Sequence, residues 1–241
     1  MTDIQISINN KTYPTATTPS ISNLKLSLNS NEFVCLVGPS GCGKTTLLNI
    51  IAGLDKDYDG DILVGQHAEP KIGYVFQNPR LLPWRTVREN IELALDAQSS
   101  IRGIDDLLEI MQLTAAQHSY PERLSLGMSR RVAIIRAFAV DPDVLLMDEP
   151  FVSLDAPTAR LARELLLDLW RQRPHTVLFV THDLREAIAL ADRLIFLSAS
   201  PMQLVSEIAV PIPRTERHDE LAIEAFRQQL LTYHPEIKQL L

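Results

Sequence analysis

The clearest chemical pattern in the sequence is a glycine-rich segment that matches GxxxxGK[ST], the spacing of a phosphate-binding loop. Its residues are Gly38, Pro39, Ser40, Gly41, Cys42, Gly43, Lys44 and Thr45. An apolar run, Phe33–Val37, precedes the segment, and a helical pattern follows it from Thr45 to Ala52. Backbone N–H groups and a helix N-terminus can therefore surround a polyphosphate here. We expect Lys44 to bind the β- and γ-phosphates and Thr45 to provide a hydroxyl ligand to Mg²⁺.

A second group of chemically suited residues follows two further apolar runs. The run Val144–Met147 leads into Asp148 and Glu149. The run Val177–Thr181 leads into His182. Because the ends of strands in an open α/β sheet carry side chains to the ligand crevice, we expect Asp148 to bind Mg²⁺ and Glu149 to orient the attacking water. A neutral His182 could contact the γ-phosphate and hold Glu149 with the water.

Taken alone, these three residues allow a plainer explanation. Two acidic residues at the end of a strand are usually a solvated terminus, and a single histidine is more often structural than catalytic. The hydrolytic interpretation of Asp148, Glu149 and His182 therefore depends on the phosphate-binding loop that precedes them in the chain.

The elements that must position these residues alternate between strands and helices. Ile4–Ile8 and Leu24–Leu28 alternate apolar and polar residues, which predicts half-buried strands in an antiparallel edge sheet. Phe33–Val37, Val144–Met147 and Val177–Val180 are nearly continuous apolar runs, as expected of central parallel strands covered by helices on both faces. Helical patterns fall between these runs, so the sequence predicts an α/β fold.

Strand signals disappear between Trp84 and Ala139. Helical spacing is carried there by four apolar residues, Ile104, Leu107, Leu108 and Met111. This pattern predicts a helical subdomain at 86–139, inserted into an α/β core that is formed by residues 1–85 and 140–241.

The overall composition excludes some functions. The formal net charge of −7 argues against non-specific nucleic-acid binding, because a phosphate backbone requires clustered Lys and Arg. No apolar run approaches the roughly 20 residues that a membrane-spanning helix needs. The first residues lack the basic and then apolar order of a signal peptide. We therefore expect a cytosolic protein that binds no nucleic acid.

Six motifs, in this order, resemble those of the nucleotide-binding subunit of ABC transporters over essentially the whole chain. They are Walker A at 38–46, the Q-loop at Gln77, the signature at 124–128, Walker B at 145–150, the D-loop at 153–155 and the H-loop at 181–183. The resemblance adds Thr46 to the nucleotide-binding residues and gives Gln77 a role in catalysis and metal binding. It also implies a P-loop NTPase core with a central, mainly parallel sheet, an N-terminal antiparallel β-subdomain and an inserted α-helical subdomain.

The same resemblance implies that ATP and Mg²⁺ are bound between two copies arranged head to tail, as a homodimer or a pseudo-dimer. Ser125 and the Gly127 amide of one copy would then reach the γ-phosphate held by Walker A of the other. Asp155 would contribute to the same site, and we expect it to cap the helix that follows. Tyr13 lies where the family has an aromatic residue that stacks on adenine, although the Thr, Pro and Asn around it could equally mark an ordinary loop tyrosine.

Leu81–Trp84 resembles a stretch found in ABC importers of the nitrate, sulfonate and taurine group, and the segment from Ser200 onward is similar to theirs. In that group the region after the Q-loop faces a coupling helix of the membrane subunit. The resemblance therefore implies an importer motor, bound peripherally to the cytoplasmic face of the inner membrane. Its partners would be integral membrane permease subunits and, indirectly, a solute-binding protein. In this family, other subunits select the solute.

The signature departs from the family pattern at Leu126, where the family usually has glycine. If this position has a positive φ, leucine costs roughly 1–2 kcal/mol, and its bulk could hold the two copies apart. We therefore expect slowed hydrolysis. Two alternatives are a non-transport ABC ATPase and a nucleotide-sensing subunit with weak turnover. The chain has neither a second cassette nor a long coiled-coil insertion, and Glu149 and His182 are intact, which favours the importer.

Overall fold

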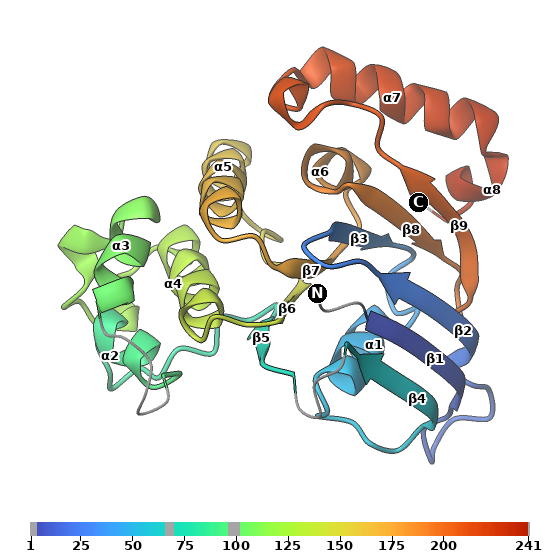
Figure 1. The fold of residues 1–241 in the computed structure, drawn as a ribbon, viewed down its shortest axis with the longest axis horizontal. Helices are drawn as coiled ribbons and strands as arrows, with labels where there is room; N and C mark the ends of the chain where they lie inside the picture. Colours follow the sequence, from blue (N-terminus) through green and yellow to red (C-terminus); the bar gives the residue numbers. More distant parts are fainter. Residues whose placement is uncertain (1–3, 66–69, 96–101, 241) are drawn as a thin grey trace. The chain divides into compact units, whose positions relative to one another are not determined.

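The computed structural model describes residues 4–65, 70–95 and 102–240. The chain divides into two compact units, of which the first combines residues 1–69 with residues 176–241 and the second spans residues 70–175. Both units contain β-strands and α-helices (Figure 1). The α/β fold class predicted from the sequence is thus confirmed.

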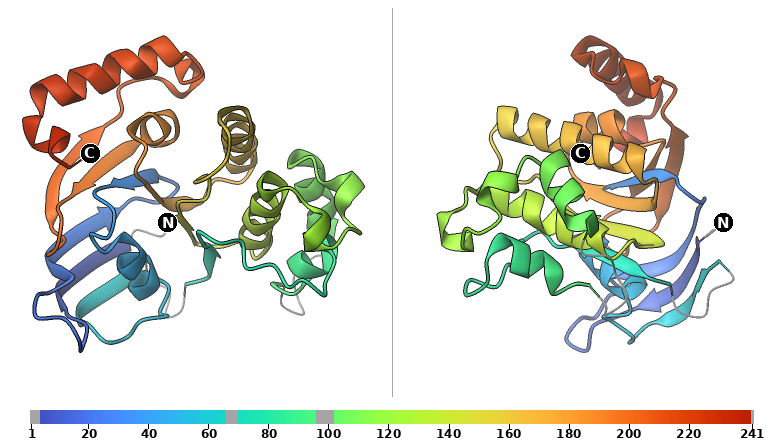
Figure 2. Two further views of the ribbon diagram at one scale, coloured as in Figure 1. Left: turned by 180° about the vertical axis from the view of Figure 1, so that it is seen from behind. Right: turned by 60° about the vertical axis from the view of Figure 1, so that its left-hand side comes forward.

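An antiparallel sheet of three strands opens the first unit, with β1 in the middle. Its strands are β1 (Ile4–Lys11), β2 (Ile21–Leu28) and β4 (Asp59–Val64), which lie side by side in Figure 2. Ile4, Ile6 and Ile8 of β1 are buried, whereas the residues between them are more exposed. The two alternating segments of the sequence are therefore strands of one antiparallel sheet, as predicted.

Four further strands of the first unit pair in the order β7-β3-β8-β9. They are β3 (Phe33–Val37), β7 (Thr176–Thr181), β8 (Arg193–Leu197) and β9 (Leu204–Ala209). β7 and β8 run parallel to β3, whereas β9 is antiparallel to β8. Every residue of β3 and β7 is buried, which explains why both are continuous apolar runs rather than alternating ones.

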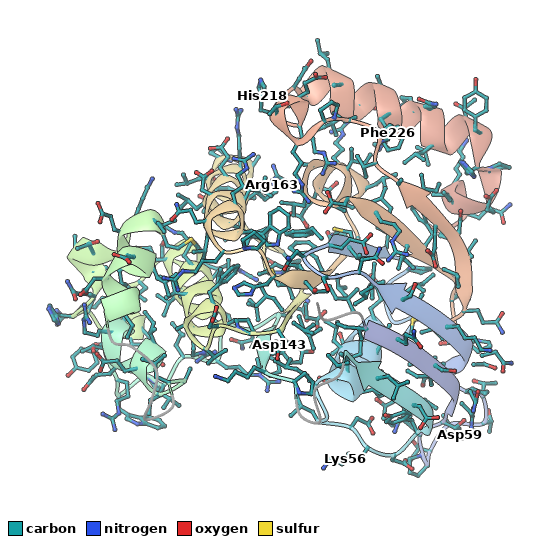
Figure 3. The ribbon with its side chains drawn as sticks, in the orientation of Figure 1. Lys56, Asp59, Asp143, Arg163, His218 and Phe226 are labelled. Atoms are coloured by element: carbon teal, nitrogen blue, oxygen red, sulfur yellow. The ribbon has the colours of Figure 1, made fainter. Side chains whose placement is uncertain are left out.

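The described part of the first unit also contains four α-helices. They are α1 (Lys44–Ile51), α6 (Leu184–Leu190), α7 (Glu220–Tyr233) and α8 (Pro235–Lys238). α6 packs against β3 and β7, and α7 packs on α6. Phe226, labelled in Figure 3, is buried on α7 together with Ile223 and Leu230.

Two arginines tie the segment after β9 to the strands. Asp192 accepts hydrogen bonds from the Phe33 N–H and from Arg214 Nε, both at 3.0 Å. Arg217 Nη1 donates to the Ala191 carbonyl at 2.6 Å. Burial lowers the pKa of Arg217 to about 10, and the nearby Arg214 charge acts in the same direction. Arg217 still carries its charge at neutral pH, so a cation holds this segment.

The second unit contains a parallel strand pair and a group of helices. Its elements are β5 (Ile72–Val75), β6 (Val144–Asp148), α2 (Val87–Glu92), α3 (Arg102–Ile110), α4 (Leu126–Ala139) and α5 (Ala156–Gln172). α4 contacts α2, α3, α5 and β5. Asp143, labelled in Figure 3, accepts the Lys71 N–H at 2.9 Å, just before the two strands begin to pair. A separate helical subdomain at 86–139 stays a prediction.

The helices begin near the residues expected from the sequence. α1 starts at Lys44, one residue before the predicted Thr45. Asp155 caps α5 as predicted, because its carboxylate accepts the Thr158 N–H at 3.3 Å. None of the helices in the described part of the chain combines the length and the apolar character needed to cross a bilayer.

β3 leads directly into the phosphate-binding loop, so its buried side chains should contribute strongly to stability. We predict that Leu36→Ala lowers the free energy of unfolding by about 2–5 kcal/mol, because it leaves a cavity in the core. The control Leu63→Ala, on β4 where the leucine is 60% exposed, should change it by less than about 0.5 kcal/mol. Urea denaturation measures both effects, and equal midpoints for the two variants would contradict the prediction.

Candidate functional site

The phosphate-binding loop connects the end of β3 to the start of α1 in the first unit. Gly38 is buried next to the end of β3, and Ser40 and Gly41 form an exposed tip. Gly43, the last residue before α1, has φ 110°, which residues with a Cβ rarely adopt. The first turn of α1 contains no acidic residue. The positive end of its dipole therefore favours an anion at the loop.

The Lys44 side chain folds over this loop. It is only 5% exposed, and its ammonium donates hydrogen bonds to the carbonyls of Gly38 at 2.7 Å and Pro39 at 2.8 Å. Cys42 Sγ is buried 3.7 Å from the same nitrogen, which fits a packing role. Phosphate oxygens could replace the carbonyls as partners of the ammonium. Thr45, next in the chain, is exposed on the first turn of α1, where its hydroxyl could reach a phosphate-bound metal ion.

Tyr13 lies beside the same helix. Its hydroxyl is 3.0 Å from the Thr46 hydroxyl of α1. Lys11 Nζ lies 4.7 Å from the centroid of the tyrosine ring, within cation–π range, and forms a 2.9 Å ion pair with Asp55. The ring, which is 39% exposed, thus has a defined place next to the loop. It could stack against the base of a nucleotide bound there.

His182 lies at the end of the strands where the loop begins. In the parallel pairing of β3 with β7, Val37 is opposite Thr181. Gly38 and His182 are the next residues after these paired strand ends. The Thr181 hydroxyl accepts the Asp183 N–H at 3.0 Å, which orders the turn that carries His182. The structure therefore brings His182 and the start of the loop to the same sheet edge.

In the second unit, β6 ends at the two predicted carboxylates. Asp148, the last residue of β6, is buried, and Glu149 follows it with φ 44°. A left-handed backbone costs a non-glycine residue roughly 1–2 kcal/mol, and such conformations cluster at functional sites. Burial and then the charge of Asp148 raise the pKa of Tyr74 on the neighbouring β5. The two carboxylates therefore lie in different environments. Asp148 is buried at the end of a strand, and Glu149 lies in a turn with a strained backbone.

Gln77 and Glu149 are linked through their backbones by Arg130 of α4. Arg130 Nη1 donates to the carbonyl of Gln77 at 3.2 Å, to that of Glu149 at 3.3 Å and to that of Pro150 at 2.7 Å. The Gln77 side chain is exposed. From the sequence, Gln77 was assigned to the metal and Glu149 to the attacking water. Both residues therefore lie on chain segments whose carbonyls bond the same guanidinium.

The signature residues begin α4 and lie against the start of α5. Ser125 caps α4, because its Oγ accepts the Met128 N–H at 3.2 Å. A Cβ on Gly127 would lie 2.5 Å from Thr158 Cγ2, so glycine permits this close packing. Hydrogen bonds from the Thr158 side chain and backbone lower the pKa of Asp155. Ser125, Gly127 and Asp155 are therefore brought together within the second unit.

Leu126 is the first residue of α4 and has a right-handed helical backbone. The strained backbone considered from the sequence is therefore absent, because every L-residue can adopt this conformation. The leucine side chain is 45% exposed. Two effects were expected for Leu126, backbone strain and side-chain bulk. Only the bulk of the exposed side chain is compatible with the structure.

The predicted metal ligands are hard oxygen donors. Thr45 offers a hydroxyl, Gln77 an amide oxygen and Asp148 a carboxylate, which are ligand types that suit Mg²⁺. Within residues 4–65, 70–95 and 102–240, no group of three or more His, Cys, Asp or Glu side chains could hold a metal ion. Mg²⁺ commonly keeps several waters and binds substrate phosphates with few protein ligands, and oxygen donors of these types suit that kind of coordination.

Two residues of the site were missed by the sequence analysis, Lys11 and Arg130. Both are buried charged residues, at the end of β1 and in α4. Such a charge signals that partners must exist, because a buried charge without hydrogen bonds is costly. The sequence pattern does not identify those partners.

Comparison with known proteins agrees with the motifs. The family model described as ABC transporter matches residues 21–152. The aliphatic sulfonates import ATP-binding protein SsuB of Bacillus cereus is 43% identical over 225 residues, which cover 90% of this chain and 89% of that protein. The nitrate import ATP-binding protein NrtD of Synechococcus elongatus is 39% identical over 236 residues, which cover 92% of this chain and 86% of that protein.

A solved structure shows the same fold. The dimeric, post-hydrolysis structure of the ATP-binding cassette MJ0796, bound to ADP and Pi, matches with a TM-score of 0.73 at 30% identity. The match covers 87% of this chain and 100% of that chain. Fold, motif order and relatives agree, and the chain belongs to the ABC transporter family.

Proposed function

We propose that the chain is the ATP-hydrolysing motor subunit of an ABC importer and couples MgATP hydrolysis to transport by integral membrane permease subunits. The observation that carries this proposal is the position of the Lys44 ammonium, inside a loop at the N-terminus of α1. A helix N-terminus and a lysine together favour a bound polyphosphate. The relatives that are named import ATP-binding proteins favour an importer over a non-transport ATPase.

Nucleotide binding involves both ends of the ATP molecule. Lys44 exchanges its loop carbonyls for oxygens of the β- and γ-phosphates, and the loop amides at 41–43 donate to the same phosphates. Thr45 and Asp148 provide oxygen ligands for Mg²⁺, which neutralises charge on the phosphates. At the other end, Tyr13 stacks on the base, with its hydroxyl anchored to Thr46.

Hydrolysis is assigned to the residues that follow the strands. Glu149 orients the attacking water and accepts its proton while the water oxygen bonds to the γ-phosphorus and the bond to the ADP oxygen breaks. His182 contacts the γ-phosphate and keeps the water with Glu149. Gln77 contributes its amide oxygen to the metal.

A second subunit completes the site in this proposal. Ser125 and the Gly127 amide, at the N-terminus of α4, contact the γ-phosphate bound by the other copy, and Asp155 lies next to them. The first turn of α4 contains no acidic residue that would repel phosphate. The dimeric MJ0796 cassette with ADP and Pi supports this arrangement. The second copy is either identical to this chain or a related subunit.

The segment after Gln77 is suited to a membrane partner. Asn90, which is buried, accepts the Leu82 N–H at 2.7 Å and donates to the Leu82 carbonyl at 3.2 Å. This fixes the backbone, and Trp84 remains 68% exposed. We assign this segment to contact with the permease, at the cytoplasmic face of the inner membrane. A solute-binding protein would deliver the solute, which the relatives' names suggest is a nitrate- or sulfonate-type anion.

The Glu149→Gln variant tests the proposed activity. It should bind MgATP, accumulate as a dimer and lose at least about 100-fold in kcat, because a general base contributes about 10²–10⁴-fold. Phosphate release and size-exclusion chromatography with ATP measure these effects. The control Glu109→Gln, at an exposed position of α3, should retain wild-type turnover. If the wild-type chain, alone or with its permease, shows neither Mg²⁺-dependent ATP binding nor phosphate release, the proposed function is wrong.

The bulk of Leu126 gives a second prediction. We expect Leu126→Gly and Leu126→Ala each to raise the steady-state ATPase rate, by about threefold to tenfold, which corresponds to less than about 1.4 kcal/mol in the barrier. The alanine variant keeps the helix propensity that glycine loses at the start of α4. An unchanged or lower rate in both variants would contradict a role of the bulk and favour a subunit with intrinsically weak turnover.

Tyr13 gives a third prediction, on affinity rather than turnover. Tyr13→Ala should raise the Kd for ATP about tenfold, since stacking of an aromatic side chain on a base contributes about 1–3 kcal/mol. Tyr13→Phe keeps the ring and should stay within about threefold of the wild type. Calorimetric titration measures both, and Tyr233→Ala, at an exposed position of α7, is the control. Equal affinities of the Tyr13→Ala variant and the control would make Tyr13 an ordinary loop residue.

A further inference from the structure

Arg130 is a buried cation whose partners are backbone carbonyls. It lies on α4, is 5% exposed, and brings Nη1 within 3.3 Å of three carbonyl oxygens, those of Gln77, Glu149 and Pro150. Within the described part of the chain, its guanidinium bonds to no carboxylate, and Nε has no hydrogen-bond partner. Burial of a charge without a counter-ion is costly unless hydrogen bonds compensate. The bonds to the three carbonyls must supply that compensation.

These carbonyls belong to two chain segments that are distant in sequence. Gln77 is 53 positions from Arg130 and follows β5, whereas Glu149 is 19 positions away and follows β6. β5 and β6 are parallel neighbours, so both segments leave the same end of the strand pair. Arg130 bridges them at that end.

The bridge reaches the turn in which the Glu149 backbone is left-handed. The Glu149 carbonyl accepts the Val152 N–H at 3.2 Å as well as Arg130 Nη1. The next carbonyl, that of Pro150, makes the shortest of the three bonds, at 2.7 Å. A strained conformation persists only where its surroundings hold it, and here a charged donor bonds two successive carbonyls of the turn.

We propose that Arg130 is a positioning residue for hydrolysis, which fixes the Gln77 and Glu149 backbones relative to each other and so sets where the Glu149 carboxylate and the Gln77 amide stand. This inference rests on the proposed function, because that proposal assigns the water and the metal to these two residues. Arg130 bonds these residues only through their backbone carbonyls, and we assign it no contact with the water or the metal. An arginine suits the task because its planar guanidinium holds its donors in a fixed orientation and stays charged when buried, whereas lysine is a compact, strongly hydrated point charge.

Arg131 provides a matched control on the same helix. Its Nη1 donates to the Met111 carbonyl at 2.7 Å, so it also anchors α4 to a backbone oxygen. It is half buried, and it has no bond to Gln77, Glu149 or Pro150. Arg131→Met therefore removes a comparable bond from α4 without changing the bridge between the two segments.

The first measurement follows the bridge itself, in the full-length chain without nucleotide. Amide hydrogen exchange should become at least about fivefold faster in Arg130→Met, both in the segment around Gln77 and at Val152. Arg131→Met should leave exchange in these two segments unchanged. Unchanged exchange in Arg130→Met would overturn the proposal, whether or not the chain hydrolyses ATP. Absence of hydrolysis in the wild type would instead count against the proposed function.

The second measurement separates positioning from general stability. In Arg130→Met, kcat per ATP-binding site should fall at least about tenfold, while the Kd for MgATP stays within about threefold of the wild type. Arg130→Lys should restore part of kcat, because a cation of similar length can still bond one carbonyl. Arg131→Met should keep kcat within about twofold. Equal losses in Arg130→Met and Arg131→Met, or a loss of ATP affinity in proportion to kcat, would overturn the proposal.

If Arg130→Met fails to fold, the proposal can still be tested with Arg130→Lys. Arg130→Lys keeps the charge and most of the volume, and its thermal unfolding can be compared with that of the wild type. A folded Arg130→Lys variant with wild-type exchange around Gln77 and Val152 and wild-type kcat would show that the arginine fork is not needed, and the proposal would fail. Faster exchange at both places together with a lower kcat would support it.

Discussion

The ammonium of Lys44 can lie among the carbonyls of Gly38 and Pro39 only if a buried strand ends at Val37 and a helix begins at Lys44. That requirement explains much of the first unit. β3 must be covered so that its end is fixed, and α6 packs against it. The register of β3 with β7 then puts His182 beside the start of the loop. The chemistry of the phosphate site thus depends on where one strand stops.

The sequence predicted those features of the fold and the site that depend on neighbouring residues. The loop, its flanking strand and helix, and the cap at Asp155 are local, since each needs only a few consecutive side chains and the backbone conformations that they favour. The alternation of β1 and β2 is also local, because one buried face produces a period of two. The continuous runs of β3 and β7 predicted burial on both faces, which the structure confirms.

The features that were missed depend on contacts between distant residues. Lys11 pairs with Asp55, 44 positions away, and Arg130 bonds Gln77, 53 positions away. No pattern of period two or 3.6 encodes such partners. The backbone conformation at Leu126 could not be predicted either. A motif that usually contains glycine does not indicate whether its residues precede a helix or begin it. The structure places Leu126 inside α4 and so removes the strain.

The contacts of Arg130 are compatible with the proposed role of Glu149 as a base. In the proposed mechanism Glu149 accepts a proton from the attacking water, and an ion pair formed directly on a carboxylate weakens it as a base. Arg130 bonds the main-chain carbonyl of Glu149 instead. A hydrogen bond to a carbonyl fixes the backbone through a neutral acceptor, while the charge of the donor makes the bond stronger than a neutral one. Since the side-chain direction follows from the backbone conformation, a cation bound in this way can position the carboxylate without forming a direct ion pair with it.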